Sequence, residues 1–139
     1  MKIKKSKIGF TLMEVLVVVI ILGVIAAFAL PNYAKSVRQS HERDMVNQLR
    51  VIYAADLMYR AQADLYLIGA NLDTNAINNQ LDLSIMSSDG TTYDYTSADG
   101  NTFQVDSIWS DMTVRVTQAP LSWNNPCCSS LNCPALPGC

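Results

Sequence analysis

Outside its first seven residues, this 139-residue chain has few basic side chains. Four of its ten basic residues lie within that short stretch: Lys2, Lys4, Lys5 and Lys7. The remaining residues carry six basic side chains against twelve acidic ones, which gives them a formal charge of −6. A protein that binds nucleic acid through the phosphate backbone needs a basic patch. The composition therefore gives no reason to expect a nucleic-acid partner.

The sequence also lacks the clusters that catalysis and metal binding require. His41 is the only histidine and has no second ligand type nearby, so we expect a solvated helix residue. No metal-ligand cluster or glycine-rich phosphate-binding loop is present. The spacing of four acids does not match a calcium-binding EF-hand loop, and turn chemistry explains them better; they are Asp89, Asp94, Asp99 and Asp106. We predict a protein that is not an enzyme and has no cofactor or metal.

The most prominent feature is a long apolar run that carries one acid near its start. Phe10 to Leu30 is 21 residues, and a helix of that length spans about 31 Å, which matches a bilayer core. The preceding lysines predict a single membrane pass with a cytoplasmic N-terminus. Glu14 would cost roughly 2.5–3.5 kcal/mol near the bilayer centre and less toward its edge. We therefore expect this carboxylate to meet a positive partner.

A cleaved secretory signal is the alternative interpretation of this run. Ala27-Phe28-Ala29 follows a basic and then an apolar region, as a signal-peptidase site does. Cleavage there would release a secreted, soluble, disulfide-bonded binding domain. Glu14 argues against this alternative, because an ordinary signal has no charge at the start of its apolar region. A helical pattern also follows the run directly, with no loop between them.

That helical pattern extends well beyond the apolar run. Apolar residues recur at spacings of three or four, which defines one stripe of a helix; they are Val46, Leu49, Tyr53, Leu57, Ala61 and Leu65. We predict one helix over about 10–66, kinked near Pro31 because proline removes a backbone donor. Residues 10–31 would be the apolar, transmembrane part. Residues 32–66 would be amphipathic and would pack under a small head.

The head is predicted to comprise residues 67–139. Asp73 or Thr74 is expected to cap a short helix that ends at Leu81. Apolar residues then alternate with polar ones around the turn signal at 97–101, which predicts short antiparallel strands. The expected strands are 91–96, 102–108 and 112–118. They would form a β-meander whose apolar face covers the stripe of the long helix.

The tail, residues 119–139, is rich in proline and is not expected to form regular secondary structure. It contains all four cysteines: Cys127, Cys128, Cys133 and Cys139. An exported tail favours two disulfides, and a bond between the two adjacent cysteines would be strained. Each of these is therefore expected to pair with Cys133 or Cys139. A zinc site made by all four is the alternative, although the spacing lacks two CxxC pairs.

The residues from Gly9 to Glu14 resemble the prepilin processing motif of type IV pilins and of type II secretion pseudopilins. The resemblance covers residues 1 to about 60 and includes a short lysine-rich leader, 1–9. Gly23 and Pro31 also lie where such proteins carry them. The resemblance implies an α+β, pilin-like fold, in which one long N-terminal helix packs on a small antiparallel sheet.

The resemblance also implies a sequence of events. A prepilin peptidase would cut between Gly9 and Phe10 and methylate the new Phe10 amine. Glu14 would then pair with that amine, mostly the one of a neighbouring subunit, although the spacing of four residues also allows a pair within one chain. Thr11 would also belong to the assembly segment. The helix between Gly23 and Pro31 would lose helical structure in a filament, or would merely kink.

The implied function is a structural subunit of a type IV pilus-like extracellular filament. Its partners would be itself, as a helical homopolymer, other pilin subunits, the prepilin peptidase, an inner-membrane assembly platform, and membrane lipid before assembly. The implied location is the inner membrane before assembly and the cell surface afterwards. A type II secretion pseudopilin is the alternative within the same family.

Overall fold

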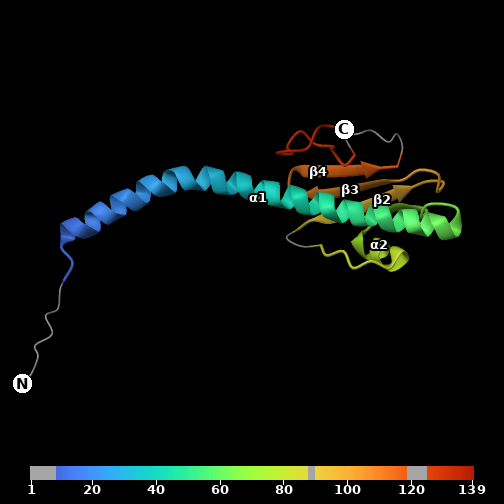
Figure 1. Cartoon of the computed structure of the whole chain (residues 1–139), viewed down its shortest axis with the longest axis horizontal. Helices are drawn as coiled ribbons and strands as arrows, with labels where there is room; N and C mark the ends of the chain where they lie inside the picture. Colours follow the sequence, from blue (N-terminus) through green and yellow to red (C-terminus); the bar gives the residue numbers. More distant parts are fainter. Residues whose placement is uncertain (1–8, 88–89, 119–124) are drawn as a thin grey trace, which may run out of the picture. The chain divides into compact units, whose positions relative to one another are not determined.

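The computed structural model describes residues 9–87, 90–118 and 125–139 (Figure 1). The chain forms two compact units, residues 1–36 and 37–139. The lysines of the predicted leader lie outside the described residues, as does the beginning of the predicted tail.

One long helix, α1, runs from Leu12 to Ala63. It ends where Asp64 adopts a left-handed conformation, with a φ of 63°, and donates its N–H to the Arg60 carbonyl at 2.8 Å. A left-handed residue at this position closes the last turn of a helix, and aspartate tolerates that conformation better than most residues do. The predicted helix is confirmed, although the predicted bounds of 10–66 are slightly too wide.

The head contains a five-stranded antiparallel sheet in which neighbouring strands follow one another along the chain (Figure 1). Its strands are β1 (Gly69–Leu72), β2 (Thr92–Ser97), β3 (Gln104–Trp109), β4 (Met112–Thr117) and β5 (Cys127–Cys128). The three predicted strands correspond to β2, β3 and β4, so the meander is confirmed. The two outer strands were missed.

The prediction that the tail has no regular structure is wrong at β5. This strand pairs Cys128 with Val114 and Cys127 with Arg115. Two residues are too short to show the alternation by which a strand is recognised in a sequence. Pairing with β4 and the two disulfides hold this segment in the sheet. The prediction rested on the proline content of the tail, which carries no information on either contact.

The short helix α2, Thr74–Leu81, lies between β1 and β2. Asp73 is its N-cap, and the Asp73 carboxylate accepts the Ala76 N–H at 2.9 Å. This contact satisfies one of the free N–H groups of the first turn. The predicted capped helix is confirmed.

The core of the head lies between α1 and the inner face of the sheet. It is built from three residues of α1, from alternate residues of the strands, and from the loops that join them. The buried members are Met45, Leu49, Ile52, Tyr66, Leu67, Ile77, Ile85, Tyr93, Tyr95, Phe103, Val105, Met112, Val114 and Val116. Phe103 contacts three tyrosine rings, and its closest ring neighbour is Tyr66, at 4.9 Å between centroids.

The buried stripe of α1 differs from the predicted one. The buried residues of the helix are Glu42, Met45, Leu49, Ile52 and Asp56. Leu57 and Leu65 of the predicted stripe are instead about 40% exposed. The buried stripe has an acid at each end, Glu42 and Asp56. A search for regularly spaced apolar residues does not identify an acid as a buried residue. The predicted face is therefore rotated away from the true one.

Candidate assembly site and the contacts of the head

The predicted cleavage point lies in an exposed segment just before α1. Gly9 and Phe10 are both exposed, and neither belongs to a helix or strand. A Cβ at Gly9 would meet no atom within 4 Å. The structure therefore leaves the peptide bond between these residues open to a partner.

Thr11 and Glu14 together cap the N-terminus of α1. The Thr11 hydroxyl accepts the Glu14 N–H at 3.3 Å, and the Glu14 carboxylate accepts the Thr11 N–H at 3.3 Å. This reciprocal pair is a capping box, which satisfies two free N–H groups at the start of a helix. The sequence analysis missed it, although a Thr followed three residues later by Glu is its recognised signature. In the uncleaved chain, Glu14 therefore already turns toward the end of the helix at which the new amine would appear.

The first half of α1 presents its apolar side chains outward. The most apolar 18-residue window of the helix has a mean hydropathy of 2.9, and none of it is buried. Its length and composition are sufficient for a membrane span. Gly23 has no atom within 4 Å of an added Cβ, so the described residues do not require a glycine there for space. An apolar surface of this extent needs lipid or a partner to cover it.

Pro31 lies inside α1, and the helix continues through it. Because proline has no N–H, the carbonyl one turn earlier loses its usual helical donor. The next residue, Asn32, donates its side-chain amide to the Phe28 carbonyl at 3.2 Å. Pro31 therefore does not end the helix. The Asn32 amide adds a hydrogen bond to the Phe28 carbonyl, whereas the carbonyl that loses its donor to Pro31 is that of Ala27.

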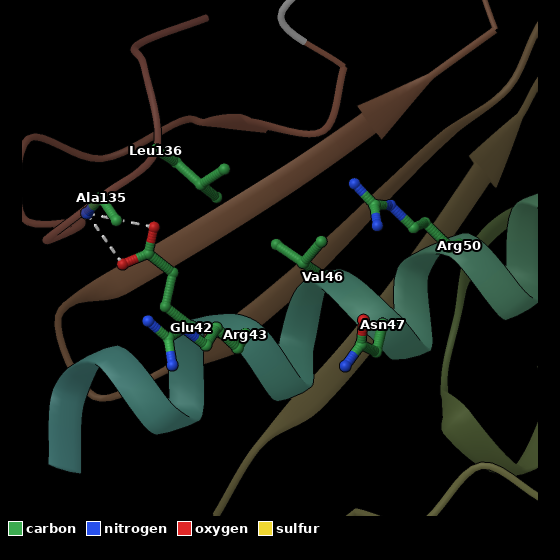
Figure 2. A pocket seen from close by; sticks show the side chains of 7 residues that line it. All are labelled: Glu42, Arg43, Val46, Asn47, Arg50, Ala135 and Leu136. Carbon is green, nitrogen blue, oxygen red and sulfur yellow. Dashed lines mark hydrogen bonds between the residues drawn. The ribbon is translucent and has the colours of Figure 1, made fainter. Parts of the chain in front are cut away.

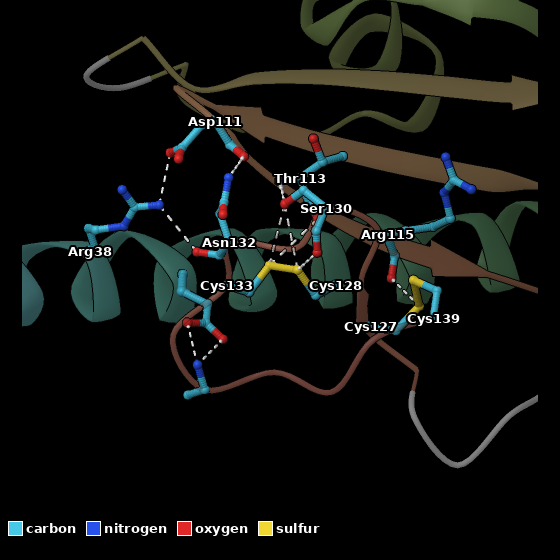
Figure 3. Close-up of a disulfide and its surroundings, with 12 residues drawn as sticks. Arg38, Asp111, Thr113, Arg115, Cys127, Cys128, Ser130, Asn132, Cys133 and Cys139 are labelled. Atoms are coloured by element: carbon cyan, nitrogen blue, oxygen red, sulfur yellow. Dashed lines mark hydrogen bonds and ion pairs between the residues drawn. A yellow bond between two sulfur atoms is a disulfide. The ribbon is translucent and has the colours of Figure 1, made fainter.

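The C-terminal tail is attached to α1 by a buried acid that the sequence analysis did not single out. Glu42 is 2% exposed, and its carboxylate oxygens lie 3.0 and 3.2 Å from the Ala135 N–H, which donates to them (Figure 2). One turn earlier, Arg38 donates to the Asp111 carboxylate at 2.8 Å and to the Asn132 carbonyl at 3.2 Å (Figure 3). The ion pair is half-exposed and contributes little stability, whereas a buried carboxylate that lost its donor would be costly.

Two disulfides close the tail, and they resolve the pairing that the sequence left open (Figure 3). Cys127 is bonded to Cys139, and Cys128 is bonded to Cys133. All four sulfur atoms are therefore occupied, so the alternative zinc site is not formed. The tail then returns to β5, because the Cys128 N–H donates to the Pro137 carbonyl at 2.7 Å.

The two disulfides are expected to stabilise the head unequally. Cys127 and Cys139 are 12 residues apart, and Cys128 and Cys133 are 5 apart. Loop-closure entropy then predicts losses of about 3 and about 2 kcal/mol when each pair is replaced by alanine. Urea unfolding of the full chain in detergent, with each pair replaced in turn, measures both losses. A larger loss from the shorter loop would contradict the entropic account.

A second buried acid, Asp56, joins α1 to the loop that follows it. Asp56 is fully buried, and its carboxylate accepts the Leu67 N–H at 2.9 Å. The Tyr95 hydroxyl lies 2.7 Å from the other Asp56 oxygen and 2.8 Å from the Leu67 carbonyl. Burial raises the pKa of Asp56, although its two hydrogen bonds oppose that shift. Burial and the adjacent Asp56 also raise the pKa of Tyr95.

The same loop is fastened to the sheet at a glycine. Gly100, in the turn between β2 and β3, has a φ of 71°, and a Cβ there would lie 3.0 Å from the Leu65 Cβ. Its carbonyl accepts the Tyr66 N–H at 2.8 Å. Both the backbone angle and the close approach favour glycine.

His41 is not the solvated residue that was predicted. Its ring stacks on Trp109 with the centroids 4.0 Å apart, and it is half-buried. The nearby Trp ring was not visible from sequence because it comes from the end of β3. Within the described residues, no three His, Cys, Asp or Glu side chains form a group that could hold a metal ion.

The acids that raised the question of calcium have other contacts. Asp106 accepts two hydrogen bonds from Arg115, at 2.7 and 2.9 Å. Asp99 accepts the Asn101 N–H at 3.0 Å in the turn between β2 and β3. Asp94 lies opposite Asp106 in the sheet, and Asp89 is outside the described residues.

Comparison with known proteins places the N-terminal segment. A family model described as the prokaryotic N-terminal methylation motif matches residues 4–30. This match, together with the relatives described below, supports a relationship of the N-terminal part of the chain to type IV pilins and pseudopilins. The fold of the whole described chain, with one long helix on a small antiparallel sheet and a disulfide-bonded end, is likewise pilin-like.

The similar proteins of this pilin and pseudopilin family are matched over only part of their length. The type IV major pilin protein PilA of Myxococcus xanthus is 36% identical over 63 residues, which are 45% of this chain and 29% of the pilin. The type II secretion system core protein G of Vibrio cholerae is 35% identical over 66 residues, 48% of this chain and 45% of that protein. The Aeromonas hydrophila core protein G is 32% identical over 63 residues, 45% and 44% of the two chains. The matched part is thus less than half of each relative. No solved structure matches the chain.

Proposed function

We propose that this chain is a structural, non-enzymatic subunit of a type IV pilus-like extracellular filament. One observation carries the proposal: a single carboxylate, Glu14, stands at the start of an exposed apolar helix, directly after the Gly9–Phe10 bond. An anchor alone has no use for that charge, which is costly in lipid. In a filament, where the helices of neighbouring subunits pack together, the Glu14 charge can fix the axial register between those helices.

The proposed path begins in the inner membrane. The chain crosses once, with its lysine-rich end in the cytoplasm, and a prepilin peptidase cuts after Gly9 and methylates the Phe10 amine. An assembly platform then draws the subunit from lipid into a growing filament with copies of itself and other pilins. Residues 10–31 form the filament core, residues 32–66 connect it to the head, and the head, 67–139, faces outward.

Within that path, Glu14 pairs with the Phe10 amine of a neighbouring subunit. A buried amine is strongly penalised unless it is paired, and this amine does not exist before cleavage. The capping box holds Glu14 at the end of the helix where the amine appears, an orientation that fits a pair with the amine of its own chain as well as with that of a neighbour. Thr11 keeps that orientation. Gly23 and Pro31 are poor helix formers, and they bracket a stretch that can lengthen when the helices pack in a filament.

A type II secretion pseudopilin is the second candidate, and the similarity to two core G proteins favours it as much as the pilin match favours a pilus. The two candidates share processing, the membrane anchor and assembly through α1. They differ in whether a long fibre leaves the cell.

The first prediction concerns the mature N-terminus of the native protein. We expect a chain that begins at Phe10 and carries one methyl group on its amine, as measured by intact mass and N-terminal sequencing. Replacing Gly9 with a bulky residue should block cleavage and leave the leader attached, because a close backbone approach needs a residue without Cβ. A native chain that begins at Leu30 or later would instead identify a secreted soluble domain.

Electron microscopy of material sheared from the cells then separates the two filament types. Long fibres that contain the processed chain support the pilus. Processed chain that stays with the membrane, together with loss of secretion when the chain is deleted, supports the pseudopilus.

A further inference from the structure

We propose that two flanks of α1 in the head form a contact between copies of this chain, in which a basic groove on one flank receives an acidic and apolar flank of a second copy. This inference rests on the proposed function, because it supplies a contact between heads in addition to the one between N-terminal helices. It concerns only residues of the unit 37–139.

The basic flank is a groove of about 310 Å³ between α1 and the C-terminal tail (Figure 2). Val46 of the helix and Leu136 of the tail form its apolar walls, and the buried Glu42 carboxylate, which accepts the Ala135 N–H, also lines it. Arg43 and Arg50 lie along it, seven residues apart and therefore on one face of the helix. Both arginines are exposed, and within the described residues neither lies within ion-pair distance of a carboxylate.

The opposite flank of the exposed helix face is acidic and apolar. Asp44, Val51 and Met58 repeat at intervals of seven residues and so share one stripe. Val51 is 47% and Met58 68% exposed. Met58 also lines a second groove, of about 440 Å³, whose rim includes the exposed Asp82 that follows α2. This flank thus presents apolar side chains between two carboxylates.

This flank lies on the side of the helix that faces α2, because Met58 of the flank and Asp82 after α2 line the same groove. Burial raises the pKa of Tyr93 in β2, a hydrogen bond with Ser107 opposes that shift, and the charge of Asp44 adds a small increase. The tail and its disulfides lie on the other side, with the two arginines. The two flanks are therefore separate surfaces of opposite charge.

Complementary surfaces on different sides of one molecule make a heterologous contact, which continues from copy to copy instead of closing on itself. A methionine side chain suits the apolar groove because it is flexible and polarizable. Two arginines without an ion pair in the described part of the chain also fit an acidic partner. The chain itself supplies one, because its formal charge is −6 after its leader.

Charge reversal tests the contact in the full chain, expressed in its own cells. Arg43→Glu with Arg50→Glu, and separately Asp44→Lys with Asp82→Lys, should each lower the yield of sheared filaments about hundredfold, since like charges then face each other. Combining all four changes in one chain should restore most of the yield. Asp94→Lys is a control for added charge: it changes the charge half as much as either double variant, but on the outer face of the sheet, and should have little effect.

Normal filament yield from either double variant would overturn the contact, and so would failure of the combined variant to assemble while its membrane level, processing and disulfides are normal. These results are distinct from failure of the proposed function. That failure would appear in the unsubstituted chain, as a missing cleavage after Gly9 or as no assembled material.

Cross-linking identifies the partner without changing any charge. After the leader is removed, Lys35 is the only lysine in the chain, so Arg43→Lys with Arg50→Lys adds two defined amines. A carbodiimide that joins amines to carboxylates should then give a covalent dimer, and peptide mass spectrometry should find residue 43 or 50 joined to Asp44 or Asp82. Dimers linked only through other acids, or only through Lys35, would reject the contact. Inorganic sulfate, which does not react with carbodiimide, serves as the competing anion. Links that persist in excess sulfate support a copy of the chain as the occupant, whereas links lost with sulfate but kept in sodium chloride of equal ionic strength would identify the groove as an anion site instead.

Discussion

Replacing Glu14 with glutamine should lower filament yield roughly hundredfold or more while leaving cleavage after Gly9 nearly normal. The reason is the unpaired Phe10 amine that would remain in an apolar filament core, since removing one member of a buried ion pair costs about 3–5 kcal/mol. Each 1.4 kcal/mol is about tenfold in association. The measurement is the ratio of processed chain in sheared fibres to processed chain in the membrane.

Glutamine separates the two roles that the structure gives to Glu14. A glutamine three residues after the N-cap can still accept the Thr11 N–H, so the capping box survives and only the charge is lost. Glu14→Ala removes both the charge and the box, and Thr11→Ala mainly removes the box. We expect the two Glu14 variants to fail alike and Thr11→Ala, which loses about 1 kcal/mol of capping, to assemble much better. A filament yield equal to that of the unsubstituted chain from Glu14→Gln would contradict the proposed pairing of Glu14 with the amine.

The helix, the three central strands and the short capped helix were predictable because each rests on a local pattern. The run from Phe10 to Leu30 is apolar except for Thr11, Glu14 and Gly23. In the residues at 93–95 and 112–116, apolar and polar side chains alternate at a period of two. Asp73 stands immediately before the helix that it caps. Such signals need no knowledge of what lies opposite in the fold.

The parts that were missed depend on partners distant in sequence. Glu42 is buried because Ala135, 93 residues away, donates to it, and Asp56 is buried because Leu67 and Tyr95 surround its carboxylate. His41 stacks on Trp109 for the same kind of reason. Because charged residues are normally assigned to the surface, the true buried face of α1 appeared polar at both ends. A stripe at 42, 45, 49, 52 and 56 becomes recognisable only when acids are allowed in it.

Asp56 gives the second large effect, and the hydrogen-bond geometry predicts its charge state. A tyrosine hydroxyl has one proton, yet the Tyr95 oxygen lies within hydrogen-bond distance of both Asp56 and the Leu67 carbonyl. If Asp56 is protonated, its O–H donates to Tyr95, Tyr95 donates to the Leu67 carbonyl, and the Leu67 N–H donates to Asp56. Every group is then satisfied. If Asp56 is ionised, one acceptor is left without a donor.

Neutral Asp56 implies a definite pH dependence of the free energy of unfolding. Burial raises the pKa of Asp56 above its unfolded value of about 3.9, so the folded chain holds this proton more tightly than the unfolded chain does. The contribution of Asp56 to stability is complete below the unfolded pKa. It declines as pH rises toward the folded pKa and stays low above it, by about 1.4 kcal/mol for each unit of elevation.

Two variants isolate this contribution in urea unfolding of the full chain in detergent between pH 3 and pH 8. Asp56→Asn reproduces the neutral acid, since its NH₂ donates to Tyr95 and its oxygen accepts the Leu67 N–H. It should match or exceed the unsubstituted chain at neutral pH, and subtracting its profile should reveal the slope due to Asp56 alone. Asp56→Leu leaves the Leu67 N–H buried without an acceptor and should lose about 3 kcal/mol at low pH, where the contribution of Asp56 is complete, and less as pH rises. A loss of that size in Asp56→Asn would mean that the carboxylate is charged in the folded head, because only then does the amide fail to replace it.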